Sequence, residues 1–464
     1  MSLGMYIHMH WGYRHPYAAR TWSLEDWRGY AEGLKALGYN LVMIWPMTDS
    51  MPDPLTPSDR AHLEKIRAII AMLHELGMTA LVTAGPNCLG NNVAAQYPFE
   101  SRPFFAAERR INPADPAEVA ALLDFHRRLL EEYLGEADGL VIIDSDPGGY
   151  IGSTNREFLN LLLAHQAMMA GVNPRMTLYY WMWVGWEQYN KSWEAVRDGL
   201  PVDYSFSKSD CAEVVAGLLE YSTHPWAVLT CSPEHHEVVR EYDIADRALF
   251  NPYGAVEIEP AFPLTNFAPF ELQQRLKEYN PALMRLGAMA NAQTHVAQLP
   301  QTYLFAHYAH GGARRDADLR GFADGLIPGC GELLVEAWET LGSDDPARMR
   351  AAAGRMAILH RASTPGPLGG LLFGDPERYL EDLVLQLTFL ADLLDFNHTL
   401  ELPALTRFAD AFIGPVRELA EPPLRALRHP AIDEVFAVWD NWREPEKRHG
   451  IVTRMLEAIA QVIE

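Results

Sequence analysis

Several features common in other protein classes are missing from this chain of 464 residues. Its cysteines number only four and show no Cys-x-x-Cys spacing; they are Cys88, Cys211, Cys231 and Cys330. Such scatter argues against a thiolate zinc site and suits a reducing compartment. Apolar runs stay shorter than the roughly eighteen residues that a membrane-crossing helix needs, so no transmembrane segment is predicted.

Positive charge is also scarce. The chain has 38 Lys and Arg against 61 Asp and Glu, a net charge of −23. Such a surface repels nucleic acid and anionic membranes, so neither is an expected partner. The first residues lack the basic segment and apolar stretch of a signal peptide. We therefore expect a cytoplasmic location, and a leader trimmed before Met1-Ser2-Leu3 stays open as the alternative.

Three motifs of well-known enzyme classes are absent as well. There is no Gly-x-Ser-x-Gly nucleophile elbow, no phosphate-binding P-loop and no Gly-x-Gly-x-x-Gly after a predicted strand. What the chain does have is 48% apolar residues and 12 tryptophans. This composition predicts a sizeable core, with aromatic side chains left over for binding.

Short β-rich runs alternate with helical patterns over about the first 300 residues, which predicts βαβ units and a parallel sheet. The predicted strands are Tyr6–His10, Asn40–Trp45, Met78–Ala84, Gly139–Asp144, Met176–Trp183, Val202–Phe206 and Trp226–Cys231. Either Ala248–Asn251 or Gly287–Asn291 would be the closing strand. About eight strands favour an α/β fold of the closed (β/α)8 TIM barrel type over an open doubly wound sheet.

The pattern changes after Gly311-Gly312, where helical periodicity takes over. Asp345-Pro346 and Asp375-Pro376 each combine a helix N-cap with a proline in the first turn. We therefore predict a catalytic barrel over residues 4–305 and an all-helical C-terminal domain over residues 306–464. The second domain is rich in apolar side chains, so a homodimer contact there is possible.

The ends of the predicted strands are unusually aromatic. Barrel active sites are built at these ends, and sugar rings stack their apolar faces on aromatic planes while polar groups bind the hydroxyls. The expected substrate-binding residues are His10, Trp11, Tyr13, Arg14, Trp45, Asp49, Asn87, Tyr150, Trp181, Trp183, Trp186 and Glu187. The alternative is that about half of the aromatic residues fill space between helices and barrel.

Two aspartates follow the fourth predicted strand. Asp144 and Asp146 would share a face, with α-carbons about 6.5 Å apart, before the chain turns at Pro147-Gly148-Gly149. Two close carboxyl groups separate their pKa values, so one is held protonated and the other ionised, as glycosidic cleavage requires. The structural alternative is a turn that Asp146 starts, with Asp144 capping a neighbouring helix.

The segment Asp138-Gly139-Leu140-Val141-Ile142-Ile143-Asp144-Ser145-Asp146 is similar to the fourth-strand signature of chitinases. The chain thus resembles retaining glycoside hydrolase barrels of the hexosaminidase, chitinase and α-glucuronidase kind. The resemblance implies that Asp146 is the general acid. It also implies that Asp144 supports either this acid or an attacking acetamido group of the substrate.

Two departures from the chitinase pattern matter. The last acid is Asp rather than Glu, and an extra residue shifts Asp138-Gly139 relative to the pair. If Asp146 does not reach the substrate, a carboxylate from another loop would supply the second group. The candidates are Glu187, Asp203, Asp210 and Glu257.

Two other functions remain open. A sugar-binding barrel without catalysis would keep the aromatic residues and need no carboxylate pair. A metal-dependent hydrolase of the amidohydrolase kind would use His8-x-His10, but the fifth and sixth predicted strands supply no histidine. We therefore expect no metal and no cofactor, and a carbohydrate as the substrate.

Overall fold

The computed structural model describes residues 1–9, 19–85, 87–102, 108–112, 114–143, 154–183, 196–197, 200–201, 208–256, 272, 276–277, 279–292, 295–343, 345–359 and 363–399. The chain divides into two compact units. Unit 1 comprises Met1–Trp11, Tyr39–Tyr253 and Arg275–Asn291. Unit 2 comprises Gly12–Gly38, Gly254–Gln274 and Ala292–Glu464.

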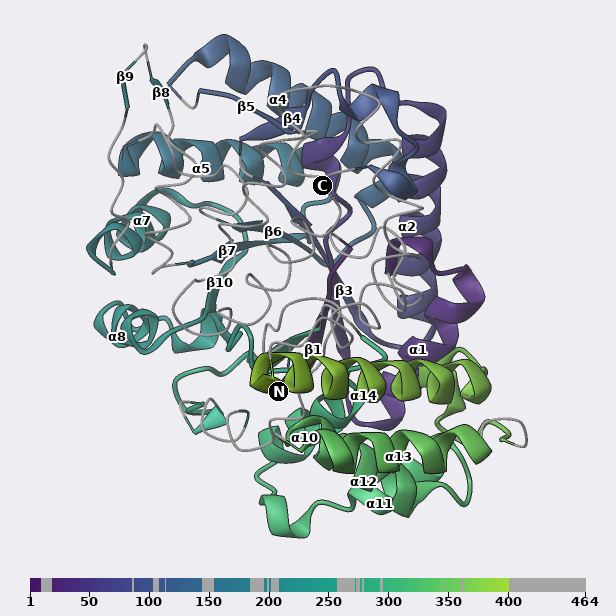
Figure 1. The fold of residues 1–464 in the computed structure, drawn as a ribbon. Helices are drawn as coiled ribbons and strands as arrows, with labels where there is room; N and C mark the ends of the chain where they lie inside the picture. Colours follow the sequence, from purple (N-terminus) through teal and green to yellow (C-terminus); the bar gives the residue numbers. More distant parts are fainter. Residues whose placement is uncertain are drawn as a thin grey trace. The chain divides into compact units, whose positions relative to one another are not determined.

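Unit 1 contains a closed parallel barrel (Figure 1). Its strands are β1 (Ser2–Ile7), β2 (Leu41–Ile44), β3 (Thr79–Ala84), β6 (Gly139–Ile143), β7 (Thr177–Trp181), β10 (Trp226–Thr230), β11 (Ala248–Phe250) and β12 (Gly287–Ala292). Around the barrel they run β1-β12-β11-β10-β7-β6-β3-β2. The predicted (β/α)8 fold class is confirmed.

The strand assignment differs from the prediction at one point. Strand β7 pairs directly with β10, so β10 takes the sixth place in the barrel that was predicted for Val202–Phe206, a segment that lies outside the described residues. The short hairpin of β8 (Val196–Arg197) and β9 (Leu200–Pro201) precedes that segment. The sequence of Val202–Phe206 alternates apolar and polar residues, a pattern typical of a half-buried strand. A strand of a parallel barrel is covered on both faces, and β10 is buried at every position, so β10 fits the sixth place better. Both candidates for the closing strand belong to the barrel, as β11 and β12.

Five α-helices are described in unit 1, and three of them begin at a residue whose side chain caps the helix. The five are α2 (Pro57–Glu75), α4 (Pro116–Leu129), α5 (Asn155–Val172), α7 (Lys208–Tyr221) and α8 (Pro233–Glu241). Thr56 and Thr154 form capping boxes, and Asp115 caps α4. Along the chain, α4 packs on α5, α5 on α7 and α7 on α8, outside the strands (Figure 1).

The register of the strands shows which side chains face the barrel interior. Tyr6 on β1 and Trp181 on β7 make an edge-to-face ring contact with centroids 5.6 Å apart, although their strands are not neighbours. This contact therefore crosses the interior. Tyr180, the residue before Trp181, donates its hydroxyl to Cys211 of α7 and so faces outward. Because side chains alternate along a strand, these contacts fix the inward positions of the neighbouring strands.

The secondary structure described in unit 2 is helical, apart from Ala292 at the end of β12. Its helices are α1 (Leu24–Ala36), α10 (Leu299–Ala309), α11 (Leu319–Leu326), α12 (Gly331–Leu341), α13 (Pro346–Leu359) and α14 (Pro376–Thr399). Asp345 and Asp375 accept backbone N–H bonds at the starts of α13 and α14, as predicted. The short helix η9 (Gly369–Leu372) lies so close to α1 that a Cβ at Gly33 would overlap Leu371.

The predicted boundary between the two domains and the helical fold of residues 400–464 stay predictions. The structure assigns α1 and α10 to the same compact unit as α11–α14, and residues 400–464 lie outside the described part. The boundary at residue 305 is therefore still to be tested. None of the helices that the structure describes is long and apolar enough to cross a membrane.

Two buried histidines join α4 to α5. His165 Nδ1 lies 2.9 Å from the carbonyl oxygen of Leu161, so this nitrogen carries the ring proton. Its Nε2 then accepts the Nδ1–H of His126 at 3.1 Å. His126 Nε2 has no hydrogen-bond partner among the described residues. Burial lowers the pKa of His126 to about 3 and that of His165 to about 4, so both rings are neutral in the folded protein.

We expect this pair to make the protein acid-sensitive. The unfolded chain takes up protons on both rings near the ordinary pKa of 6.5, whereas the folded chain does so only near pH 3 to 4. The free energy of unfolding should therefore fall as the pH drops from about 7 to about 4, by at most about 1.4 kcal/mol per pH unit for each ring.

The test is urea unfolding at several pH values, with the double substitution H126L/H165M. His235 and His236 also have lowered pKa values and contribute to the acid sensitivity. The double variant should therefore lose only the part of the pH dependence of the unfolding free energy that comes from His126 and His165. Phe125→Leu serves as control, because it weakens the same buried region of α4 without removing a titrating group. An unchanged slope in the double variant would contradict the expectation.

Candidate functional site

The carboxyl ends of the eight strands bring together side chains from distant parts of the sequence. Because side chains alternate along a strand, the last residue that faces the barrel interior can be identified for five of the strands. These residues are His8, Trp45, Trp183, Asn251 and Asn291. All five side chains are at least nine-tenths buried. This end of the barrel is therefore lined by aromatic rings, an imidazole and two amides, which suits a ligand with apolar faces and polar edges.

Aromatic rings form a continuous wall at this mouth. Trp181 and Trp183 meet edge to face with centroids 5.4 Å apart, and Trp183 meets Tyr253 in the same way at 4.3 Å. His8 lies between Tyr6 and Tyr253, with centroids 3.9 Å and 5.9 Å away. Trp181 and Trp183 are two residues apart, so both side chains lie on the same side of the chain, in agreement with these contacts.

The loop after β2 carries a strained residue. Met47 has a φ of 60°, in the left-handed region that a side chain with a Cβ seldom adopts. The turn brings Asp49, on the short helix η2 (Thr48–Ser50), back to Trp45, whose Nε1 donates to Asp49 Oδ1 at 2.8 Å. A Cβ at Gly85, just after β3, would lie 3.3 Å from Asp49 Cβ, a tight contact for which Asp49 would have to shift by a few tenths of an ångström. Strain of this kind is often kept at binding sites.

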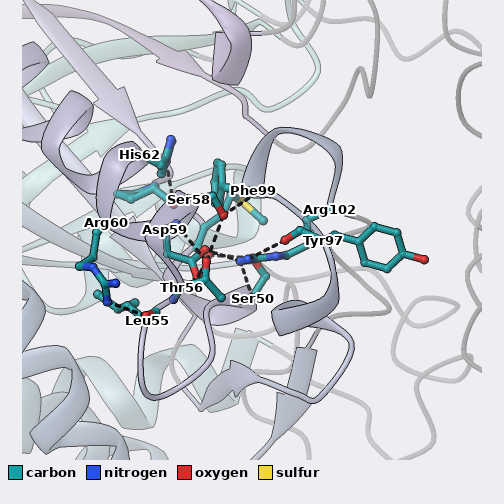
Figure 2. A network of polar contacts seen from close by, with 12 residues as sticks. Ser50, Leu55, Thr56, Ser58, Asp59, Arg60, His62, Tyr97, Phe99 and Arg102 are labelled. Atoms are coloured by element: carbon teal, nitrogen blue, oxygen red, sulfur yellow. Dashed lines mark hydrogen bonds and ion pairs between the residues drawn. The ribbon is translucent and has the colours of Figure 1, made fainter. Parts of the chain in front are cut away.

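The segment of residues 86–110 after β3 is a long insert, and a buried ion pair fixes it against this loop (Figure 2). Arg102 Nη1 lies 2.6 Å from Asp59 Oδ1, and neither side chain is exposed. The guanidinium also donates to the carbonyl oxygens of Ser50 and Tyr97, at 3.0 Å and 3.2 Å. Since Ser50 belongs to η2, Arg102 ties the insert to the segment that carries Asp49.

A ring stack adds to this attachment. Phe99 of the insert stacks on His62 of α2, with centroids 3.7 Å apart. His62 Nε2 lies 3.2 Å from the carbonyl oxygen of Pro46, in the loop after β2. The backbone N–H of Phe99 donates to Ser58 at 3.1 Å. The insert thus contributes to the shape of the loop after β2, and loops of such length are often functional.

Asn87 supports the base of the same insert. Its Nδ2 donates to the Ile111 carbonyl oxygen at 3.1 Å, and its own carbonyl oxygen accepts the Ile111 N–H at 2.9 Å. The hairpin of β4 (Cys88–Gly90) and β5 (Glu108–Arg110) begins and ends between them. Asn87 Oδ1 is buried and has no hydrogen-bond partner among the described residues, so it stays a candidate for ligand binding.

Sequence reasoning missed four residues at this end of the barrel: Cys231, Asn251, Tyr253 and Asn291. The later strands are predicted with nearly their observed bounds, but the extra strand predicted at Val202–Phe206 leaves one place for Ala248–Asn251 and Gly287–Asn291 together, so the ends of these strands are not singled out as binding positions. Asn251 is fully buried, and neither of its amide atoms has a hydrogen-bond partner in the described part of the chain. Cys231 Sγ accepts the Nε1–H of Trp181. An asparagine directly after an apolar run, in Asn251 and again in Asn291, was the available signal.

The predicted acids and several predicted binding residues lie outside the described residues. They are Asp144, Asp146, His10, Trp11, Tyr13, Arg14, Tyr150, Trp186 and Glu187. Strand β6 is described up to Ile143, which registers with inward-facing Trp181. If the strand continued with regular alternation, Ser145 would face inward and Asp144 outward. The proposal that Asp144 faces inward therefore requires that the regular strand end at Ile143.

Asp138, the first residue of the chitinase-like segment, has a structural role. Its Oδ2 accepts the Ala80 N–H at 2.7 Å and lies 3.0 Å from His74 Nε2. Both contacts are at the amino-terminal end of β6, away from the carboxyl ends of the strands. The carboxylate therefore joins β6 to β3 and α2.

The described residues offer no cluster of three or more His, Cys, Asp or Glu side chains that could hold a metal ion. His8 packs against rings, and His10 lies outside the described part. Strand β10, the actual sixth strand, contains no histidine. The absence of a metal stays a prediction.

No protein-family model matches the sequence, and no curated protein does. Among solved structures, one match is a variant of the Thermobaculum terrenum O-GlcNAc hydrolase, with 10% identity, a TM-score of 0.49 and coverage of 97% of this chain and 98% of that one. Another is a glycoside hydrolase family 138 enzyme targeting pectin rhamnogalacturonan II, with 9% identity and a TM-score of 0.44. The alignment covers 88% of this chain but only 60% of that enzyme.

A third match is a glycoside hydrolase family 20 β-N-acetylglucosaminidase, with 11% identity, a TM-score of 0.39 and coverage of 65% and 67% of the two chains. At such identities the activity has to be inferred from the side chains of this chain itself.

Proposed function

We propose that this protein is a glycoside hydrolase whose substrate binds at the carboxyl ends of the barrel strands. The observation that carries the proposal is the ring wall of Trp181, Trp183 and Tyr253 on the inward face. Strand β7, which carries both tryptophans, pairs with β6, and the next residue after β6 is Asp144. A stacking surface and a pair of acids thus belong to adjacent strands.

In this proposal Asp146 protonates the leaving oxygen, and Asp144 stays ionised beside it. The ring wall would hold the sugar by its apolar face, and the amides of Asn251 and Asn291 and the His8 ring provide polar groups around it. Such a division follows from the chemistry of glycosidic cleavage, in which one group donates a proton while charge builds up on the ring.

The test is a panel of aryl glycosides and oligosaccharides, assayed for release of the leaving group and of reducing ends. Hydrolysis of at least one member is the expected result. Saturable binding of sugars without any turnover would instead favour the non-catalytic sugar-binding barrel.

We also expect full activity after exhaustive chelation, because the wall and the two acids need no metal. The measurement is turnover before and after dialysis against a chelator, with zinc added back as the control. Activity lost with the metal and restored by zinc would favour the amidohydrolase-like alternative built on His8 and His10.

A further inference from the structure

The Asn251 side chain is a polar group without a hydrogen-bond partner in the part of the chain that the structure describes. It follows β11, where Leu249 registers with inward-facing Leu229 of β10, so alternation turns Asn251 inward as well. The side chain is fully buried, yet both Nδ2 and Oδ1 have no hydrogen-bond partner among the described residues. A buried amide without partners costs stability, so its presence requires a compensating role.

The surroundings of Asn251 are those of a ring-binding surface. The N–H of Tyr253 donates to the Asn251 carbonyl oxygen at 2.7 Å, which holds the Tyr253 ring beside this amide. That ring meets Trp183 edge to face. Cys231 and Tyr253 are only half-buried, so solvent reaches this part of the wall. The three contributing strands, β7, β10 and β11, are consecutive in the barrel.

We propose that Asn251 recognises two neighbouring hydroxyl groups of the substrate ring that packs against Trp183 and Tyr253. A primary amide presents a donor and an acceptor side by side, and a vicinal diol presents a matching acceptor and donor. One hydroxyl oxygen accepts from Nδ2, and the other hydroxyl donates to Oδ1. Asn251 is thus a specificity-determining residue for sugars that keep both hydroxyls. This inference rests on the proposed function only in taking the ligand to be a carbohydrate.

The experiment measures binding separately from hydrolysis. Protein labelled with 5-fluorotryptophan gives one fluorine resonance per tryptophan, and Trp183→Phe identifies that of Trp183. The probes are methyl glycosides of glucose, galactose, mannose and N-acetylglucosamine. The control probe is 2-(hydroxymethyl)tetrahydropyran, which has the ring but no vicinal diol.

A second readout is alkylation of Cys231 by iodoacetamide, followed by mass spectrometry. The other three cysteines are buried, so Cys231 is the accessible thiol. Its sulfur contacts the Trp181 indole, so a glycoside bound at the wall should protect it. Protection by a glycoside but not by the control probe is the expected result.

Asn251→Leu keeps the approximate size of the side chain and removes both polar atoms. We expect glycoside binding to weaken by about tenfold to a hundredfold, because two hydrogen bonds are lost. The melting temperature of the ligand-free protein should stay the same or rise by about 2–4 °C, because an unpartnered buried amide is gone. Asn251→Asp, which keeps only acceptors, should weaken binding to an intermediate degree.

Thr83→Val is the matched control. The Thr83 hydroxyl is also buried and without a hydrogen-bond partner in the described residues, and it lies on β3, across the barrel from β11. Its replacement should leave the Trp183 resonance and its response to glycosides unchanged.

Three outcomes overturn the inference: no probe shifts the Trp183 resonance, Asn251→Leu binds glycosides as the wild type does, or it melts well below the wild type. The last would mean that the amide is structural. Hydrolysis of the aryl glycoside panel together with unchanged binding by Asn251→Leu would leave the proposed function standing and remove this inference. Glycoside binding that depends on Asn251, without hydrolysis of any member of the panel, would support this inference and contradict the proposed function.

Discussion

Asp146→Asn is expected to lower the turnover of a natural glycoside by about a hundredfold to ten-thousandfold. This is the contribution that a positioned general acid makes to proton transfer. The loss should be smaller for aryl glycosides with good leaving groups, because their leaving oxygen needs little protonation. Steady-state rates across a series of aryl leaving groups measure this difference.

Asp144→Asn should behave differently. A carboxylate that stabilises charge in the transition state acts whatever the leaving group is, so both kinds of substrate should slow alike. Ser145→Ala provides the control between the two acids, and a change of only a few-fold is expected there. Turnover that survives both aspartate substitutions would remove the pair from the mechanism. A severe loss in Ser145→Ala would mean that the segment, rather than the acids, is what matters.

Arg102→Met is expected to destabilise unit 1 by about 3 to 5 kcal/mol. The substitution keeps much of the side-chain length but leaves Asp59 buried without its cation, and removing one partner of a buried ion pair typically costs this much. It also removes the hydrogen bonds to Ser50 and Tyr97 that fix the insert (Figure 2). Urea unfolding of the wild type and the variant measures the difference.

The double variant R102M/D59L separates the ion pair from its surroundings. A buried pair replaced by apolar side chains often loses little stability, so the double variant should recover much of the loss. Arg109→Met is the matched control, because Arg109 pairs with Glu118 in a half-exposed position and should matter by less than about 1 kcal/mol. Arg102→Met and Arg109→Met variants of equal stability would contradict this account of the network.

The sequence by itself determined the fold class and most of the element boundaries. Local chemistry is enough for these features. Thr56 and Thr154 cap helices through their own side chains, and Asp345-Pro346 begins a helix through interactions within the same turn, independent of tertiary contacts. The alternation of apolar strands with capped helices then leaves few arrangements other than a parallel barrel.

Tertiary structure decided which segments complete the barrel. Val202–Phe206 has the local pattern of a half-buried strand, but the edge of β7 pairs with Trp226–Thr230. Pairing between strands joins residues far apart in the sequence, so a short stretch of sequence does not show which of two candidate segments pairs with β7. The observed pairing also shows that both Ala248–Phe250 and Gly287–Ala292 belong to the barrel, so the residues at their carboxyl ends join the candidate site.

The partners of buried charges likewise depend on tertiary structure. Asp59 has the sequence position of a capping-box residue, and only the folded chain brings Arg102, 43 residues later, to its other oxygen. Asn251 shows the same limit. An asparagine after a strand is common, and only the closed barrel shows that its side chain is buried and has no hydrogen-bond partner among the described residues. The sequence determines what each segment forms alone, whereas burial and pairing are properties of the whole barrel.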